Sequence, residues 1–199
     1  MMKLIDPTVV LDHLGKDASP DNISAATSAV EIATATIEAR LATAFKAGTK
    51  TDIFFVTSGM AVGSIFLTRF WLSRGFVSNI VAITATSASA LSGSETTTLT
   101  EIISDNDKGI VTEAATDLTG TFVKITYNFG FADTTGTYQA VPDWLAEACK
   151  LLALCTMISS PNPTLEQKDL KDQSKALVTQ FEAIMGQNVR YAPGALLPI

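Results

Sequence analysis

The histidine at position 13 is the first residue to test for catalysis, because it is the only imidazole in the chain. A Ser-His-Asp or Cys-His site would depend on His13 alone. It lies in a short N-terminal segment with helical periodicity, where a surface or capping role is typical. The sequence has no P-loop, no dinucleotide-binding glycine pattern, no HExxH and no CxxC. We therefore expect no enzymatic activity and no cofactor.

One short stretch has the residue types of a metal-binding loop. Asp105-Asn106-Asp107-Lys108-Gly109 places oxygen donors before a glycine. A calcium loop would need a further Asp or Asn before its glycine and a glutamate at position twelve, where this chain has Thr116. The same stretch is typical of a hairpin turn, with Gly109 available for a positive φ. We expect a turn and no metal site.

The tryptophans are the candidates for stacking on a ligand. Trp71 is predicted in a strand and Trp144 at a helix start, where single aromatic residues are typical of a core. A small-ligand or carbohydrate-binding module on the β-rich part would use Trp71 and Phe70. A pocket with convergent polar groups would favour that alternative.

The two cysteines indicate packing rather than a disulfide. Cys149 and Cys155 lie six residues apart on one predicted helix, a rise of about 9 Å, which is beyond disulfide reach. We expect both to be reduced, buried residues of a protein made in a reducing compartment.

Composition indicates an assembly subunit that does not grip nucleic acid. The formal net charge is −6, the sequence pI is near 4.7, and no Lys/Arg cluster occurs. Charged residues make up 17% of the chain, which is low for a freely soluble monomer and suits a surface that is partly covered by neighbours. The N-terminus lacks the long apolar core of a secretory signal.

Capping residues and helical periodicity predict helices at both ends of the chain. We expect a short helix that ends at Gly15, a long Ala-rich helix from Pro20 to about Lys46 that stops at Gly48, a helix opened by Val141-Pro142-Asp143, and a last helix from a capping box at Thr164 to about Met185, ended by Gly186.

Between Thr49 and Ala140 the period changes to that of strands. The tract Thr84–Thr98, rich in Ser and Thr, is expected to be a loop or a long hairpin tip. The predicted strands are Asp52–Thr57, Ser64–Ser73, Phe76–Thr84, Leu99–Ser104, Ile110–Thr112 and Thr121–Phe131.

The helix after Pro142 is apolar on almost every face from Leu151 to Ile158. A helix of this kind must be covered all round, and the run is far shorter than the roughly 18 to 20 residues that span a bilayer. Because the chain offers only two or three other helices, we expect a neighbouring subunit to complete the cover. The expected subunit-interface residues are Leu151, Leu154, Met157 and Ile158.

The chain end has two prolines, apolar side chains and no periodicity, so we expect an extended tail that is either disordered or docked on a partner. The predicted fold is therefore α+β, with about four core helices, two of them long. Residues 1–48 and 140–185 would form the helical core, 49–139 a β-rich insertion, and 186–199 the tail, within one structural domain.

The order of these pieces has a known counterpart. Three segments connect the hairpin to the core helix: Gly109-Ile110-Val111, the strand from Val123 to Phe131, and Val141-Pro142 to Ala148. With these segments, the chain from residue 4 to 160 resembles the head-to-tail adaptor (connector) proteins of tailed bacteriophages. The β-rich region from 49 to 104 is longer than in that family, and the tail has no motif that aligns.

The resemblance implies a non-enzymatic virion protein. Such proteins are assembled in the host cytoplasm into a homo-oligomeric ring, commonly of twelve copies, at the neck. The ring lies beneath the portal protein, extends the DNA channel without binding DNA specifically, and receives a tail or stopper protein; no membrane is involved. In several members the C-terminal segment docks onto the portal, and the docking side chains here would be Tyr191, Pro193, Leu196, Leu197 and Ile199. Another neck or tail-completion structural protein is the alternative within this class.

Overall fold

The chain folds into two compact units, which a computed structural model describes over residues 3–57, 60–62, 65–87, 96–99, 102–106, 108–114, 116–131, 141–159 and 167–188. The helical unit comprises residues 1–42 and 133–189, and the strand unit comprises residues 43–132 and 190–199. The mixed α+β class predicted from the sequence is confirmed.

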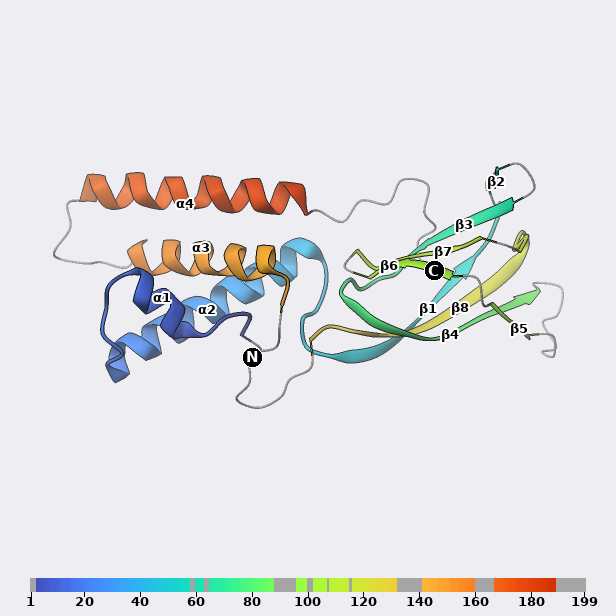
Figure 1. The fold of residues 1–199 in the computed structure, drawn as a ribbon, viewed down its shortest axis with the longest axis horizontal. Helices are drawn as coiled ribbons and strands as arrows, with labels where there is room; N and C mark the ends of the chain where they lie inside the picture. Colours follow the sequence, from blue (N-terminus) through green and yellow to red (C-terminus); the bar gives the residue numbers. More distant parts are fainter. Residues whose placement is uncertain are drawn as a thin grey trace. The chain divides into compact units, whose positions relative to one another are not determined.

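The helical unit contains the four helices of the described chain, coloured blue and orange-red in Figure 1. Asp6 caps the first helix, because its side chain accepts a hydrogen bond from the Thr8 N–H at 2.9 Å. Pro7 and Pro20 occupy first-turn positions, where a missing N–H costs nothing. The helices are α1 (Pro7–His13), α2 (Pro20–Leu41), α3 (Asp143–Ser159) and α4 (Gln167–Gln187).

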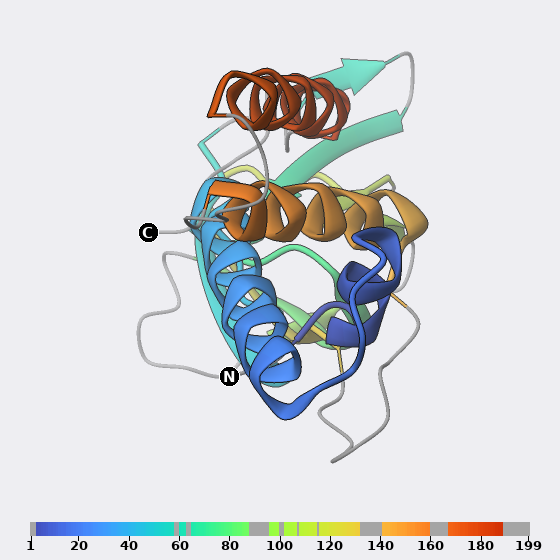
Figure 2. The same cartoon turned by 90° about the vertical axis from the view of Figure 1, so that its left-hand side faces the viewer.

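Helix α3 is the centre of this unit. It contacts α1, α2 and α4 and lies between α4 on one side and α1 with α2 on the other (Figure 2). The core that it shares with them consists of aliphatic and small side chains, which allow close helix approach. Buried members are Val10, Leu11, Ala26, Ala29, Val30, Ala33, Ile37, Leu41, Leu145, Ala148, Cys149, Leu151, Ala153, Leu154, Phe181 and Met185.

Two predicted helix ends were wrong. Helix α2 ends at Leu41 rather than near Lys46, and Ala42 takes a left-handed conformation with φ 48°. The reason lies in the strand unit, where Phe45 is fully buried and its carbonyl accepts the Phe131 N–H at 2.8 Å. At the other end of the chain, Gly186 lies within α4, which continues to Gln187. The predicted capping box at Thr164 lies outside the described residues.

The strand unit is built from two four-stranded antiparallel sheets, ordered β1-β8-β4-β5 and β2-β3-β7-β6. Strand β8 is central in the first sheet and pairs with β1 and with β4 along nearly its full length (Figure 1). The strands are β1 (Gly48–Phe55), β2 (Met60–Val62), β3 (Ile65–Trp71), β4 (Val77–Ser87), β5 (Thr96–Thr98), β6 (Ile102–Asp105), β7 (Ile110–Glu113) and β8 (Thr121–Phe129).

The two sheets pack against each other through one apolar core. The rings of Phe54 on β1 and Phe70 on β3 lie 5.0 Å apart by their centroids, which is typical of a packed aromatic pair. The period of two along each strand places the core residues on the inner faces. This core contains Phe54, Val56, Phe70, Leu72, Val77, Ile83, Ala85, Leu99, Val111, Leu118, Val123, Ile125 and Tyr127.

All six predicted strands have a counterpart, with shifted ends. Strand β1 begins at Gly48, four residues before the predicted start, because Gly48–Thr51 continue the pairing with β8. The Ser/Thr tract forms part of a β4–β5 pair in which Thr84–Thr86 face Thr96–Thr98, and residues 88–95 of the tract lie outside the described residues. The turn predicted at Gly109 is confirmed, since β6 and β7 pair across it and Gly109 has φ +65°.

Candidate functional site

The apolar helix α3 is covered by its own chain more completely than its sequence suggests. Leu151 and Leu154 are buried, with 5% and 1% of their surface exposed. Met157 and Ile158, one turn further on, are only half-buried. Because the single chain already buries the first two residues, their burial needs no second subunit. A contact of Met157 and Ile158 with a neighbouring copy stays a prediction.

The two cysteines are free thiols, as predicted, but their surroundings differ. Cys149 is fully buried, and its sulfur lies 3.8 Å from the Thr34 hydroxyl of α2. Burial raises the pKa of this thiol to about 11. Cys155 is half-buried, with its sulfur 3.1 Å from the Ser174 hydroxyl of α4. Cys149 is therefore a packing residue, and the stability of the helical unit depends on its thiol being neutral.

The Cys149 thiol should make the helical unit sensitive to alkaline pH. Its folded pKa is about 11 against 9.0 for an unperturbed thiol, so the stabilisation is present below pH 9 and is lost as pH rises toward 11. Two pH units correspond to about 3 kcal/mol. Urea unfolding at pH 8 to 11 should show a steeper loss for the wild type and for Cys155→Ala than for Cys149→Ala. Parallel loss in all three proteins would contradict the assignment.

An ion pair joins the two helices that flank α3. The Arg40 guanidinium at the end of α2 binds the Glu182 carboxylate of α4 through both of its oxygens, with Nη1 to Oε1 at 2.6 Å. The hydrogen bond from Arg40 lowers the pKa of Glu182 and raises that of Arg40. The same guanidinium lies over the Phe181 ring, 5.5 Å from its centroid. Because both side chains are exposed, the pair adds little to the stability of the helical unit.

The ligand-binding alternative loses one of its two aromatic residues. Phe70 is fully buried between the sheets, whereas Trp71 and Trp144 are half-buried.

His13 is exposed at the last position of α1. Among the described residues, no group of three His, Cys, Asp or Glu side chains could hold a metal ion. Over the same part of the chain, no helix has the length and apolar character needed to cross a membrane.

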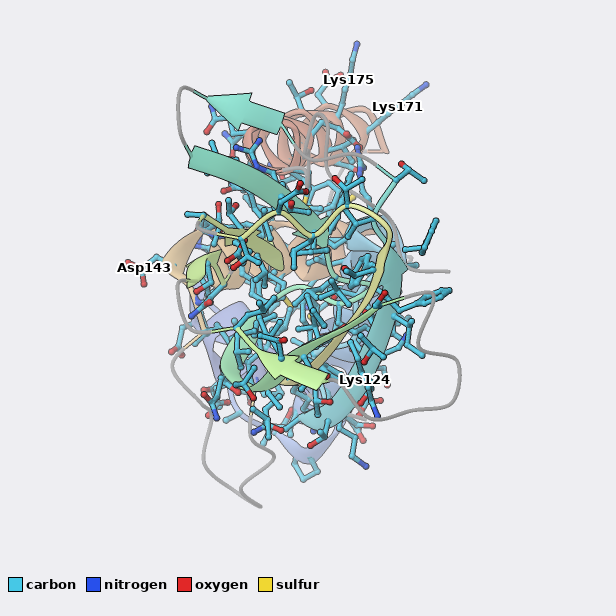
Figure 3. All side chains as sticks on the ribbon, turned by 90° about the vertical axis from the view of Figure 1, so that its right-hand side faces the viewer. Lys124, Asp143, Lys171 and Lys175 are labelled. Atoms are coloured by element: carbon cyan, nitrogen blue, oxygen red, sulfur yellow. The ribbon has the colours of Figure 1, made fainter. Side chains whose placement is uncertain are left out.

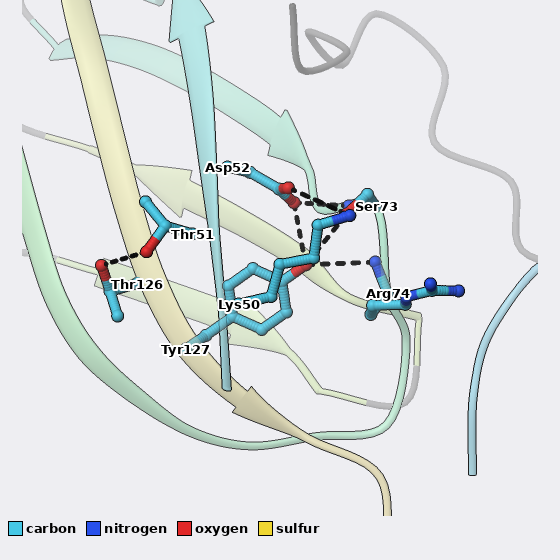
Figure 4. Close-up of polar contacts among 7 residues, drawn as sticks. All are labelled: Lys50, Thr51, Asp52, Ser73, Arg74, Thr126 and Tyr127. Carbon is cyan, nitrogen blue, oxygen red and sulfur yellow. Dashed lines mark hydrogen bonds and ion pairs between the residues drawn. The ribbon is translucent and has the colours of Figure 1, made fainter. Parts of the chain in front are cut away.

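A buried carboxylate, which the sequence analysis missed, organises the strand unit (Figure 4). Asp52 on β1 is 4% exposed and accepts hydrogen bonds from the Ser73 N–H (2.7 Å), the Ser73 hydroxyl (2.8 Å) and the Tyr127 hydroxyl (2.8 Å). Lys50 Nζ lies 3.8 Å from the same carboxylate. The Asp52 carboxylate therefore fixes the loop after β3 to strands β1 and β8.

Tyr127 completes this cluster from the central strand. Its hydroxyl oxygen accepts a hydrogen bond from the Arg74 N–H at 3.2 Å, and its O–H donates a hydrogen bond to the Asp52 carboxylate. Burial, together with the neighbouring Asp52 carboxylate, raises the pKa of the phenol well above its usual range. A phenol that stays protonated and a carboxylate with three donors are satisfied partners, and this arrangement is structural.

Two positions of the strand unit require glycine because the backbone approaches them closely. A Cβ at Gly109 would lie 2.2 Å from the Arg74 carbonyl oxygen. A Cβ at Gly130 would lie 2.7 Å from the carbonyl oxygens of Phe45 and Lys46. Both glycines have positive φ, +65° and +78°. Only glycine meets both constraints, so these positions are fixed by backbone approach.

The predicted portal-docking residues lie outside the described residues. They are Tyr191, Pro193, Leu196, Leu197 and Ile199.

Comparison with known proteins gives similarity to solved structures only. No protein-family model matches the sequence, and no curated protein matches it. One similar chain comes from the virion of a native gene transfer agent particle, with 18% identity, a TM-score of 0.42, and coverage of 87% of this chain and 89% of that chain. Another comes from the neck of a native gene transfer agent particle computed with C12 symmetry, with 20% identity, a TM-score of 0.43, and coverage of 87% and 88%.

Proposed function

We propose that this chain is a structural protein of the neck of a tailed phage or phage-like particle. In this role it forms a ring of twelve copies beneath the portal, extends the DNA channel and connects head to tail. The proposal assigns it no catalysis and no cofactor. The other candidate within this class, a neck or tail-completion protein at another level, differs only in which neighbour the ring contacts.

One observation in the chain itself carries the proposal. The three segments of the adaptor resemblance occupy the structural junctions of this fold: Gly109 at the β6–β7 turn, β8 at the centre of its sheet, and Pro142 just before α3. The tight contacts of Gly109 and Gly130 give the segments a physical reason. The similar solved chains only suggest the class of assembly in which to test the proposal.

Charge distribution fits a protein that lets DNA pass. Acidic and basic side chains are equal in number in the strand unit, so the whole net charge of −6 falls on the helical unit. A wall that attracted phosphates would slow the passage of DNA, whereas a neutral or acidic wall would not. This distribution supports a channel part over a DNA-binding protein.

Truncation after Asn188 tests the portal contact. Helix α4 ends at Gln187, so the cut leaves every described helix intact. We expect an unchanged helical circular dichroism signal and loss of binding to the portal protein in a pull-down, because an extended apolar tail gains its affinity from a partner's grooves. A full-length protein with Leu196 and Leu197 changed to serine is the matched variant and should lose binding as well. Retained binding by the truncated protein would contradict the portal-docking role.

A further inference from the structure

The side chain of one arginine in the strand unit has no polar partner among the described residues. Arg74 lies in the loop between β3 and β4, and its side chain points away from the cluster of Asp52 and Tyr127 (Figure 4). Its guanidinium makes no hydrogen bond or ion pair with any residue that the structure describes, and its Nε atom is buried without an acceptor. Buried donors in native proteins are almost always paired, so this one indicates that a partner is missing.

The backbone at Arg74 is held at three points, so the side chain leaves the loop from a fixed place. The Arg74 N–H donates to the Tyr127 hydroxyl at 3.2 Å. The Arg74 carbonyl oxygen lies against the backbone of Gly109, where a Cβ would come within 2.2 Å of it. The N–H of the next residue, Gly75, donates to the hydroxyl of the buried Thr43 at 3.1 Å. A cation that is already fixed loses little conformational freedom when it binds a partner.

The same chain contains a completed form of this arrangement. In the helical unit, the Arg40 guanidinium lies over the Phe181 ring, 5.5 Å from its centroid, and binds both oxygens of the Glu182 carboxylate. In the strand unit, the half-buried Arg74 guanidinium lies over the Phe129 ring at 5.9 Å, and no described carboxylate pairs with it. The ring holds the guanidinium plane, whose edge presents N–H groups in the fork that a carboxylate fills. The comparison indicates that the missing ligand is a carboxylate.

The surplus of carboxylates in this chain lies on the helical unit, which carries the whole net charge of −6. In the strand unit, the Asp52 carboxylate already accepts hydrogen bonds from Ser73 and Tyr127. Asp143, in the first turn of α3, projects into solvent (Figure 3). Within the described part of the chain, the exposed aspartates of the helical unit whose side chains have no hydrogen bond or ion pair are Asp12, Asp21, Asp143 and Asp172.

We propose that Arg74 of one copy of this chain binds the carboxylate of an exposed aspartate on the helical unit of a second copy. This inference rests on the proposed ring and names one contact between its copies. Opposite charge favours the strand unit of one copy against the helical unit of the next over a contact between two helical units. A contact of two unlike surfaces is head-to-tail, and it closes into a ring when the rotation allows it.

Three full-length variants test the contact by sedimentation velocity, alone and with the portal protein. Arg74→Gln should weaken self-association at least about 30-fold, because removing one partner of a partly buried ion pair leaves the other unpaired. Arg74→Lys keeps the charge without the planar fork and should lose less. Lys124→Gln is the control, because Lys124 is an exposed cation of the same unit, on β8 (Figure 3). It should assemble like the wild type.

Asparagine substitutions identify the acceptor. Among single changes of Asp12, Asp21, Asp143 and Asp172, one should weaken association as Arg74→Gln does, and combining the two should weaken it no further. Four variants that all assemble like the wild type would overturn the proposal. In the unfolding of the dilute monomer, the effects of the same two changes should be additive. Coupling between them in the monomer would place the ion pair within one chain and overturn the contact between copies.

Phosphate is the other anion that a guanidinium fork binds, and fluorescence anisotropy with a labelled DNA duplex tests it. We expect the wild type and Arg74→Gln to bind the duplex equally weakly. A loss of duplex binding in Arg74→Gln together with unchanged assembly would make the ligand a phosphate and overturn the proposal. Rings of Arg74→Gln as stable as those of the wild type would also overturn it and leave the ring proposal standing. A wild type that stays monomeric, alone and with portal, would overturn both.

Discussion

Gly109→Ala is expected to lower the free energy of unfolding by about 2 to 5 kcal/mol, with left-handed strain contributing about 1 to 2 and overpacking about 1 to 3. The new methyl would lie 2.2 Å from the Arg74 carbonyl oxygen, so the backbone must move. That movement should also weaken the hydrogen bonds from Leu72 N–H to the Gly109 carbonyl and from Val77 N–H to the Asn106 carbonyl, each 2.8 Å long. Urea unfolding measures the total.

Gly120→Ala is the matched control for this effect. Gly120 has φ +76°, yet nothing lies within 4 Å of the position that its Cβ would take. It should therefore cost only the conformational strain, about 1 to 2 kcal/mol. Hydrogen exchange at Leu72 and Val77 should accelerate in the Gly109 variant and not in the control. Equal losses of stability in both variants would mean that the Arg74 carbonyl imposes no steric limit.

Asp52→Ala is expected to destabilise the protein by about 3 to 5 kcal/mol, because it leaves buried donors without an acceptor. The Ser73 N–H loses its acceptor, and of the Ser73 and Tyr127 hydroxyls, which lie 3.2 Å apart, only one can donate to the other. Tyr127→Phe removes only one of these donors and should cost about 1 to 3 kcal/mol. Denaturant unfolding followed by tryptophan fluorescence measures both.

Asp105→Ala gives the comparison for a surface carboxylate. Asp105 is an exposed residue with a lysine nearby, Lys108 Nζ at 3.6 Å, and its loss should cost under about 1 kcal/mol.

In a double-mutant cycle, Asp52→Ala and Tyr127→Phe should be non-additive, because the two residues share a hydrogen bond. Additive losses would show that the cluster does not act as a unit.

The local elements of this fold could be predicted because their signals are local. Pro7 and Pro20 in first-turn positions, the hairpin residues before Gly109 and the alternation along β8 each act within a few neighbours. The end of α2 could not, since Phe45 is drawn out of the helix by Phe76 and Phe131, whose rings lie 5.5 and 6.0 Å from its own. No signal near residue 45 reports those distant partners.

The candidate site was only partly predictable for the same reason. The apolar run in α3 correctly indicated a helix that needs cover, but not which of its residues its own chain would bury. Leu151 and Leu154 are buried within the chain, whereas Met157 and Ile158 remain partly exposed. Asp52 could have been found from the sequence, because it alternates in step with Phe54 and Val56, which face the core. A carboxylate at such a position must have buried donors.

Cryo-electron microscopy of the full-length protein assembled with the portal protein tests the central claim most directly. We expect a closed ring with twelvefold symmetry, coaxial with the portal, in which helices of neighbouring helical units touch. Particles in which the protein remains a monomer, or binds away from the portal axis, would contradict a role in the neck.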